Sequence, residues 1–114
     1  MGDCIFCRII RKEIPSRIVY EDDQVVAMED IAPVAPLHIL IVPRKHIDNV
    51  LDLDDGDNAL VGHIHQVAGH IARTRGVAEK GFRIVNNTNA DAGQSVFHIH
   101  FHLLAGRHLA WPPG

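Results

Sequence analysis

The chain of 114 residues has little that would favour a membrane, a secreted protein or nucleic-acid binding. Its longest apolar run, at residues 37–42, is far too short to span a bilayer, and residues 1–4 lack the charged and apolar regions of a signal peptide. The formal net charge is −3 and no basic run is present, which argues against electrostatic binding of nucleic acid. We therefore expect a cytoplasmic protein with no membrane or nucleic-acid partner.

Cysteine is scarce as well. The two cysteines, Cys4 and Cys7, have Cys-x-x-Cys spacing. In a reducing compartment this spacing favours a metal site or a redox pair over a structural disulfide. A thioredoxin-type redox pair should follow a strand, and nothing before Cys4 could form one. Two unligated thiols in a helix remain the alternative to a metal site.

The remaining composition is that of an ordinary globular domain. Hydrophobic residues make up 46% of the chain, which is enough for a core and argues against disorder. We expect one domain over residues 1–114 that ends in a tail at residues 105–114. A protomer of this size leaves much apolar surface uncovered, so a dimer would not be surprising.

Apolar periodicity and turn residues predict two helices and about five strands. The helices are expected over residues 4–12, with Asp3 as the cap, and over residues 52–75. Antiparallel hairpins with few crossovers predict an α+β fold, in which the long helix covers one face of a single sheet. The strands are expected over residues 18–21, 25–29, 37–42, 81–85 and 97–104.

Three histidines, His98, His100 and His102, occupy alternate positions in the last predicted strand. Alternate side chains of a strand point to opposite faces, so the three imidazoles share one face and the apolar residues between them share the other. Packing explains the apolar residues, but it does not explain three titratable rings side by side. We therefore expect the chemistry on the histidine face and expect that face to be open.

Two interpretations of these histidines follow from imidazole chemistry. A His-x-His pair on a strand can bind zinc and leave a catalytic position open. Alternatively, one neutral imidazole attacks a carbonyl or phosphoryl centre and forms a covalent intermediate, while its neighbours orient it or its substrate. The attacking ring must then donate its other N–H to a fixed acceptor, because this leaves the attacking lone pair free.

The loop before the last predicted strand favours the nucleophile. Gly93 lets backbone N–H groups approach an anion closely, and Ser95 adds a hydroxyl donor. An amide donor comes from Asn86 or Asn87. Donors clustered beside a nucleophile suit phosphoryl transfer, in which catalysis is mostly positioning and charge stabilisation.

A metal can still be held elsewhere, because the cysteine pair needs two more ligands for a closed tetrahedral site. His46 follows a predicted buried strand and His98 opens the last one. A zinc site with two cysteines and these two histidines would tie the short helix to the sheet. It would also leave His100 and His102 for catalysis.

These motifs together resemble the histidine triad, or HIT, family, and within it the Hint branch. The run from His98 to Leu104 is similar to the family's His-x-His-x-His-x-x signature, in which x is apolar. The similarity covers nearly the whole chain, at Cys-Ile-Phe-Cys-Arg-Ile-Ile (4–10), Glu-Ile-Pro (13–15), Val-Tyr-Glu-Asp (19–22), Asp-Ile (30–31), Pro-Leu-His (36–38), Pro-Arg-Lys-His (43–46), Gly-Gln-Ser-Val (93–96) and the terminal Trp-Pro-Pro-Gly.

The resemblance implies a HIT-like fold and a homodimer whose two sheets join into one ten-stranded sheet. The Hint branch binds purine nucleotides and hydrolyses the P–N bond of nucleoside 5′-phosphoramidates through a nucleotidyl-histidine, releasing products such as AMP or GMP. The zinc of its bacterial members is structural, so no cofactor is needed for catalysis. The alternative function is a nucleotide-binding regulatory or partner module with only slow hydrolysis.

The resemblance also implies roles for individual residues. His100 is the nucleophile and His38 supports it, while His102 and Ser95 contact the phosphate. The terminal Trp111 resembles a tail that reaches the partner subunit's site. The ligands of a structural zinc are Cys4, Cys7, His46 and His98. The nucleotide-binding residues are Ile5, Phe6, Ile9, Met28 and Ile31 around the base, Asp30 on the ribose, and Asn86 or Asn87, Gly93, Gln94, Ser95, His100 and His102 around the phosphate.

One segment departs from the family pattern. The loop at residues 86–93 is one residue longer than usual, so both of its first two asparagines remain candidates for the phosphate. Three further histidines, His63, His65 and His70, lie on the long predicted helix. We expect these three to be solvated and to have no catalytic role.

Overall fold

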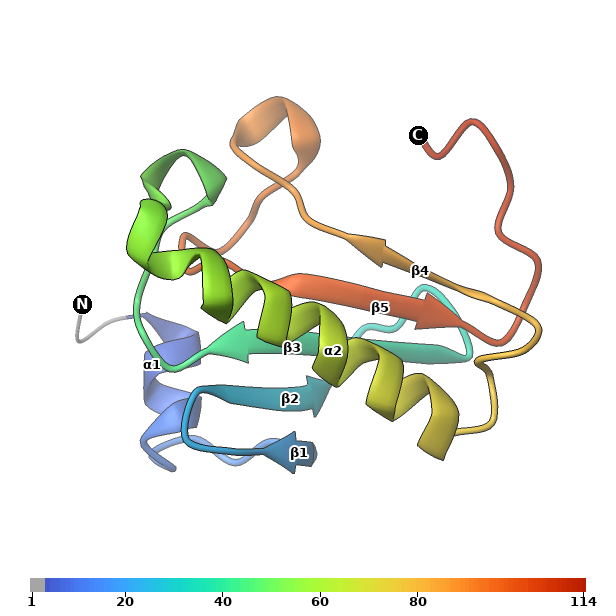
Figure 1. Cartoon of the computed structure of the whole chain (residues 1–114), viewed down its shortest axis with the longest axis horizontal. Helices are drawn as coiled ribbons and strands as arrows, with labels where there is room; N and C mark the ends of the chain where they lie inside the picture. Colours follow the sequence, from blue (N-terminus) through green and yellow to red (C-terminus); the bar gives the residue numbers. More distant parts are fainter. Residues whose placement is uncertain (1–3) are drawn as a thin grey trace.

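The described residues, 4–114, form one antiparallel sheet and two α-helices in this computed structural model (Figure 1). The helices are Ile5–Ile10 (α1) and Asn58–Thr74 (α2). The sheet has the strand order β1-β2-β3-β5-β4. The strands are Ile18–Glu21 (β1), Val25–Glu29 (β2), Leu37–Pro43 (β3), Phe82–Val85 (β4) and Phe101–Ala105 (β5). The predicted α+β fold is confirmed, with α2 across one face of the sheet (Figure 1).

The sheet separates two hydrophobic clusters, and strand alternation decides which residue joins which cluster. On the α2 face, the cluster includes Ile99, Phe101 and Leu103, the residues that alternate with the histidines. On the other face, Phe6 and Ile9 of α1 pack against side chains of β2 and β3. The histidine face is therefore partly covered by α1, and the expectation that it would be open is wrong for this part of the sheet.

The last strand begins at Phe101, four residues later than predicted. In the β3–β5 register Phe101 pairs with Ile41, so the next pair in the same register would join Ile99 to Pro43. Proline has no backbone N–H, so it cannot donate to a ladder there. The N–H of Ile99 instead donates to the carbonyl of Ile47 at 2.6 Å. The chain before Phe101 thus leaves the sheet and carries His98 toward α1.

Both helices also begin later than predicted. The first turn of α1 is capped by Cys4, whose Sγ accepts the backbone N–H of Cys7 at 3.5 Å, and the expected cap, Asp3, lies outside the described residues. Two 3-10 turns, Val50–Asp52 and Asp55–Asp57, precede α2. The first is capped by the Asn49 side chain, and the second by residues 54 and 57, which cap one another in a reciprocal capping box. No helix within residues 4–114 is both long enough and apolar enough to cross a membrane.

One helix histidine is not solvated as predicted. The Nε2 atom of His63 lies 2.7 Å from Oδ2 of Asp22, and the Tyr20 hydroxyl donates to the same carboxylate at 2.7 Å. Burial alone would raise the pKa of Asp22, but these bonds and two backbone N–H donors outweigh it and hold that pKa well below its usual range. The contact ties the β1–β2 turn to α2, whereas His65 and His70 are exposed as expected.

Candidate active site and metal centre

The three triad histidines lie on the α1 side of the sheet, but each has a different environment. His98 precedes β5 and is fully buried, and its ring meets the Phe6 ring edge-on with centroids 5.9 Å apart. His100 also contacts Phe6, at 5.0 Å, and His102 lies within β5 at 5.1 Å from the His100 ring. His98 and His100 therefore lie on the chain before β5, and His102 lies within the strand.

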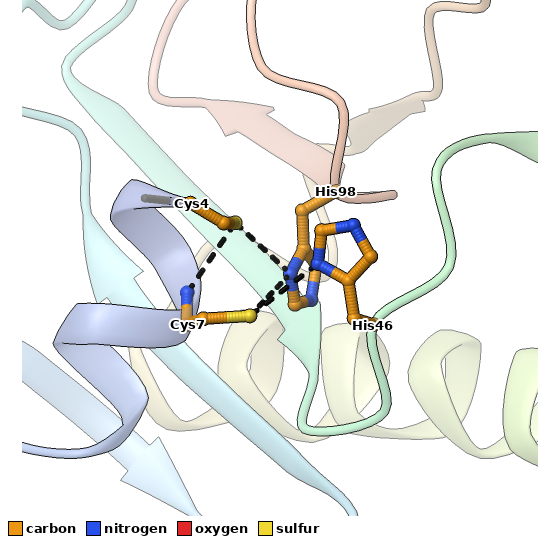
Figure 2. A group of neighbouring side chains, drawn as sticks. All are labelled: Cys4, Cys7, His46 and His98. Atoms are coloured by element: carbon orange, nitrogen blue, oxygen red, sulfur yellow. Dashed lines mark hydrogen bonds between the residues drawn. The ribbon is translucent and has the colours of Figure 1, made fainter. Parts of the chain in front are cut away.

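The ring of His98 is part of a cluster with Cys4, Cys7 and His46 (Figure 2). Cys4 Sγ lies 3.4 Å from His98 Nδ1, and Cys7 Sγ lies 3.3 Å from His46 Nδ1 and 3.6 Å from His98 Nδ1. The four candidate ligand atoms all lie within 4.8 Å of one another. They come from α1, the segment after β3 and the segment before β5, so the cluster joins three separate parts of the chain.

Hydrogen bonds on the outer side of this cluster fix the protons of both imidazoles. The Nε2 atom of His98 donates to the carbonyl of Pro43 at 2.8 Å, and Nε2 of His46 donates to the Asp48 carboxylate at 2.9 Å. A neutral ring with its proton on Nε2 presents the Nδ1 lone pair to the thiols. Burial lowers the pKa of His98 to about 4, so this ring is neutral at physiological pH. The cluster therefore has the donor set and the outer-shell contacts of a metal site.

In His100 the proton sits on Nδ1, whereas in His98 and His46 it sits on Nε2. The Nδ1 of His100 donates to the backbone carbonyl of His98 at 2.8 Å, which leaves the lone pair on Nε2. Among the described residues, Nε2 of His100 has no hydrogen-bond partner, and no fully buried side-chain nitrogen or oxygen lacks one. The Nε2 atom therefore borders solvent, as a nucleophile requires.

A chain of two hydrogen bonds determines which ring nitrogen of His102 carries the proton. We call these two bonds the relay. The backbone N–H of Val34 donates to Nδ1 of His38 at 3.1 Å, so the His38 proton sits on Nε2. That Nε2 lies 2.9 Å from Nδ1 of His102 and donates to it, which places the His102 proton on Nε2. His102 is thus a neutral donor beside His100. The structure places His38 against His102 rather than His100, because His38 and His102 lie on the paired strands β3 and β5.

Asp30, His38 and His102 also lie close enough together to suggest a cation site, but the relay argues against one. Asp30 Oδ2 is 3.4 Å from His38 Nε2. A metal ligand needs a lone pair, and the Nε2 of His38 carries the proton because its Nδ1 already accepts from the backbone. His100 belongs to neither metal-like group within residues 4–114. The geometry therefore favours the nucleophile over a catalytic zinc on the triad.

The relay predicts a dependence of stability on pH. Burial, followed by the charges of His100 and His38, lowers the pKa of His102 to about 4, whereas an unfolded histidine titrates near pH 6.5. Between these values the unfolded chain binds more protons than the folded chain, so the free energy of unfolding falls as the pH drops through this window. We expect His102→Asn to reduce the loss of stability between about pH 7 and about pH 5, measured by urea denaturation at constant metal concentration. An equal loss in the variant would contradict the assignment.

In the predicted phosphate loop, the backbone N–H groups of Gly93 and Gln94 donate to the carbonyls of Ala90 (3.0 Å) and Asn89 (3.1 Å) within the loop. Gly93 has φ 87°, which glycine adopts without strain, and Ser95 is exposed. Asn86 donates its amide to the carbonyl of His100 at 3.0 Å, so it holds the backbone of the nucleophile. The Asn87 side chain has no hydrogen-bond partner among the described residues, which favours Asn87 as the phosphate-binding asparagine. The side chain of Gln94 is buried and points into the protein.

The residues predicted around the base divide into two groups. Phe6, Ile9 and Met28 are buried in the cluster between α1 and the sheet, so core packing accounts for most of their surface. Ile5 is exposed, and Ile31 is 98% exposed. Contact of these five residues with a base stays a prediction.

Asp30, the predicted ribose ligand, follows β2 and accepts the backbone N–H of Ala32 at 2.7 Å. An open groove of about 520 Å³ lies beside it, within the volume range of small-molecule sites. Asp30 connects this groove to the triad, because its carboxylate lies 3.4 Å from Nε2 of His38, which bonds His102. The groove is lined by Pro15, Ser16, Arg17, Glu29, Asp30 and Ile31.

Several residues that shape the site were not singled out in the sequence. They are the backbone donor Val34, the carbonyl of Pro43, and Asp48 and Asn49 in the segment after β3. Backbone groups carry no sequence signal, so Val34 and Pro43 could not be found from residue types. Asp48 did have a signal, because a carboxylate two residues after a candidate histidine ligand is a plausible partner for its second nitrogen.

Comparisons with known proteins agree with this geometry. The model of the HIT domain matches residues 11–109. The chain belongs to the HIT family. A HIT-like protein of Synechococcus elongatus is 51% identical over 112 residues, which cover 98% of this chain and 97% of the relative. The purine nucleoside phosphoramidase of Escherichia coli K12 is 50% identical over 107 residues, which cover 94% of this chain and 90% of that enzyme.

Solved structures of HIT proteins have the same fold. The HIT family hydrolase of Legionella pneumophila superposes with a TM-score of 0.97 at 46% sequence identity, covering 98% of this chain and 100% of that one. A histidine triad protein of Clostridium difficile gives a TM-score of 0.93 at 51% identity, covering 96% of each chain. We conclude that this chain is a HIT-family hydrolase.

Proposed function

We propose that this HIT hydrolase cleaves the P–N bond of purine nucleoside 5′-phosphoramidates through a covalent intermediate on His100. The observation that carries the proposal is the hydrogen bond from His100 Nδ1 to the carbonyl of His98. It leaves the lone pair on Nε2, next to the neutral donor His102. The 50% identity to an enzyme named purine nucleoside phosphoramidase supports the choice of substrate.

The reaction proceeds in two displacements at phosphorus. Nε2 of His100 attacks the α-phosphorus, the bond from phosphorus to the substrate nitrogen breaks, and the amine leaves after taking up a proton from solvent. The proton stays on Nδ1 of His100 and donates to the carbonyl of His98, which stabilises the cationic nucleotidyl-imidazole. Water then attacks the same phosphorus and gives up a proton to solvent, the bond to Nε2 breaks, and the nucleoside monophosphate leaves with the ring restored.

Charge on the phosphate oxygens is stabilised by neutral donors. The proposed donors to the phosphate are His102 Nε2–H, the Ser95 hydroxyl and the amide of Asn87. Such donors need no reorganisation during the reaction, which makes them effective in a partly buried site. Asp30 is proposed to hold the ribose hydroxyls and the apolar residues of α1 the base, which would orient the phosphorus toward Nε2.

The cluster of Cys4, Cys7, His46 and His98 is proposed to hold structural zinc. Two thiols and two Nδ1 lone pairs match the ligands that tetrahedral zinc prefers. Burial raises the pKa of the Cys7 thiol, and the hydrogen bond and charge of Cys4 raise it further, so a metal would supply the positive charge that thiolates need here. Bound zinc would tie α1 to the sheet and take no part in the displacement.

We also propose a cytoplasmic homodimer. β1 and β4 are the edge strands of the sheet, and a ten-stranded sheet requires an edge strand of one protomer to meet that of its partner. The chain after β5 extends away from the sheet, and Trp111 within it is 80% exposed (Figure 1). A tail of this kind is suited to reach the partner's site.

Trapping the intermediate tests the proposed function. The wild-type protein is mixed with an adenosine 5′-phosphoramidate, quenched within one turnover and digested, and the modified peptide is located by mass spectrometry. We expect an added adenylyl group on His100, because among the three triad histidines its Nε2 is the nitrogen that is both unprotonated and accessible. Modification of another residue, or no turnover with several phosphoramidates, would contradict the proposal. Tight binding of AMP with negligible turnover would instead support the regulatory module.

A further inference from the structure

The side chain of Gln94 makes four contacts, all of them inside the protein. Its Nε2 donates to the carbonyls of Asp48 (2.8 Å) and Val96 (3.1 Å). Its Oε1 accepts the backbone N–H of Asn89 (2.9 Å) and the amide of Asn49 (3.4 Å). Every donor and acceptor of this amide is therefore engaged without a ligand. The side chain is also buried, at 7% exposure, so it has little surface to offer a phosphate.

These contacts hold Asn89 in an unusual backbone conformation. Asn89 has φ 66° and ψ −177°, a region that residues other than glycine rarely occupy. Its N–H donates to Gln94 Oε1, its carbonyl accepts the N–H of Gln94 at 3.1 Å, and its Oδ1 accepts the amide of Asn49 at 3.1 Å. Such a conformation persists only when its surroundings determine it. The shape of the loop at residues 89–95 thus depends on Gln94 and Asn49.

The loop and the nucleophile are fixed to the same short segment, residues 46–49. The carbonyl of Ile47 accepts the N–H of Ile99, directly before His100. The carbonyl of Asp48 accepts Gln94, and its carboxylate binds the ring of His46. The segment therefore sets the distance between the loop donors and Nε2 of His100.

We propose that Gln94 is a positioning residue whose side chain, together with Asn49, sets the phosphate loop relative to His100 without contacting the phosphate. The inference rests on the proposed function, because it assumes that residues 93–95 bind the phosphate. It revises the role that family resemblance implies for Gln94. Asn49 has the same positioning role. Its side chain is also buried, at 6% exposure, and therefore acts through its contacts with Asn89 and Gln94.

Two substitutions separate positioning from direct contact. Gln94→Met keeps the length of the side chain and removes all four hydrogen bonds. Asn49→Asp keeps the Oδ1 atom that accepts the N–H of Leu51 at 3.0 Å but replaces the amide donor that faces Asn89 and Gln94. The matched control is Leu51→Ala, since Leu51 is 74% exposed beside the same segment.

The metal-loaded, full-length variants are compared by kcat and KM for adenosine 5′-phosphoramidate and by calorimetric AMP binding. We expect kcat/KM to fall about 100-fold for Gln94→Met and about tenfold for Asn49→Asp, as for a misplacement of about 1 Å. The double variant should lose less than the product of both factors, because the two side chains act on one loop. Hydrogen exchange at the Asn89 amide should accelerate in both variants, and Leu51→Ala should match the wild type in every measurement.

Wild-type kinetics in Asn49→Asp, with a loss confined to Gln94→Met, would show direct contact and overturn the inference. Fast exchange at Asn89 with unchanged kinetics in both variants would overturn it as well. If Gln94→Met does not fold, the kinetics of Asn49→Asp decide the question. We expect this variant to fold, because it keeps the side-chain oxygen that accepts the N–H of Leu51. An inactive wild type would contradict the proposed function itself, whereas failure of the inference leaves wild-type activity intact.

Discussion

Replacing His100 by alanine or glycine is expected to reduce phosphoramidate turnover by at least about 10⁴-fold, because no other imidazole nitrogen can take its place. His98 directs its Nδ1 lone pair to the thiols, and the proton of His102 sits on the accessible Nε2. Binding of AMP should change less than about tenfold, since the loop donors and Asp30 remain. Single-turnover kinetics and calorimetry measure the two effects separately.

A second measurement guards against a folding defect. The His100→Gly variant leaves a cavity beside Phe6, and free imidazole should restore part of the turnover by acting as the nucleophile there. His65→Gln is the matched control, because His65 is exposed on α2 and is expected to be without effect. Near-normal turnover in His100→Gly without imidazole would show that the nucleophile lies elsewhere.

Removing the metal is expected to affect stability far more than the chemical step. Cys4 and Cys7 hold α1, while His46 and His98 hold the segments beside β3 and β5. Without the metal this junction keeps only weak thiol–imidazole contacts, so we expect the midpoint of thermal unfolding to fall by roughly 10 °C or more. The value of kcat for protein that is still folded should change by less than about threefold, because neither His100 nor His102 is a ligand.

A chelator titration followed by calorimetry and by activity measures both quantities. The variant Cys7→Ser provides the control, since it should already have the lowered midpoint and should respond little to the chelator. Rapid loss of activity in a protein that keeps its full thermal stability would indicate a catalytic metal instead. Restored stability on adding zinc, but not magnesium, would confirm the ligand preference of the site.

Local rules account for much of the fold. The alternation around the triad predicted which residues face α2, and Ile99, Phe101 and Leu103 do belong to that core. The same alternation placed the start of β5 four residues too early, because periodicity does not show which residue of the neighbouring strand each residue will pair with. Pro43 lies 56 positions before Ile99 in the chain, and only their pairing shows that the ladder must stop.

For the candidate site, too, the sequence identified residues, whereas the structure determined their contacts. Residue types and spacing led to the four candidate metal ligands, and the structure brings them together at hydrogen-bonding distances. The partner of His38 was predicted as His100 and is His102, since strand register decides which ring lies within reach. The family resemblance implied that Gln94 lies beside the phosphate, but the orientation of its side chain depends on Asp48 and Asn49, which lie far from it in the chain.

The amino-acid sequence alone was therefore sufficient for the family, the fold class and the choice of candidate reactive side chains, because these depend on residue type and short-range spacing. The tertiary structure alone decided where each imidazole proton lies. A proton's position depends on which carbonyl, carboxylate or N–H faces the second ring nitrogen, and those partners, such as Val34 and Pro43, are backbone groups brought in by chain folding. The difference between a metal ligand, a nucleophile and a donor among three adjacent histidines is thus a property of their neighbours in space.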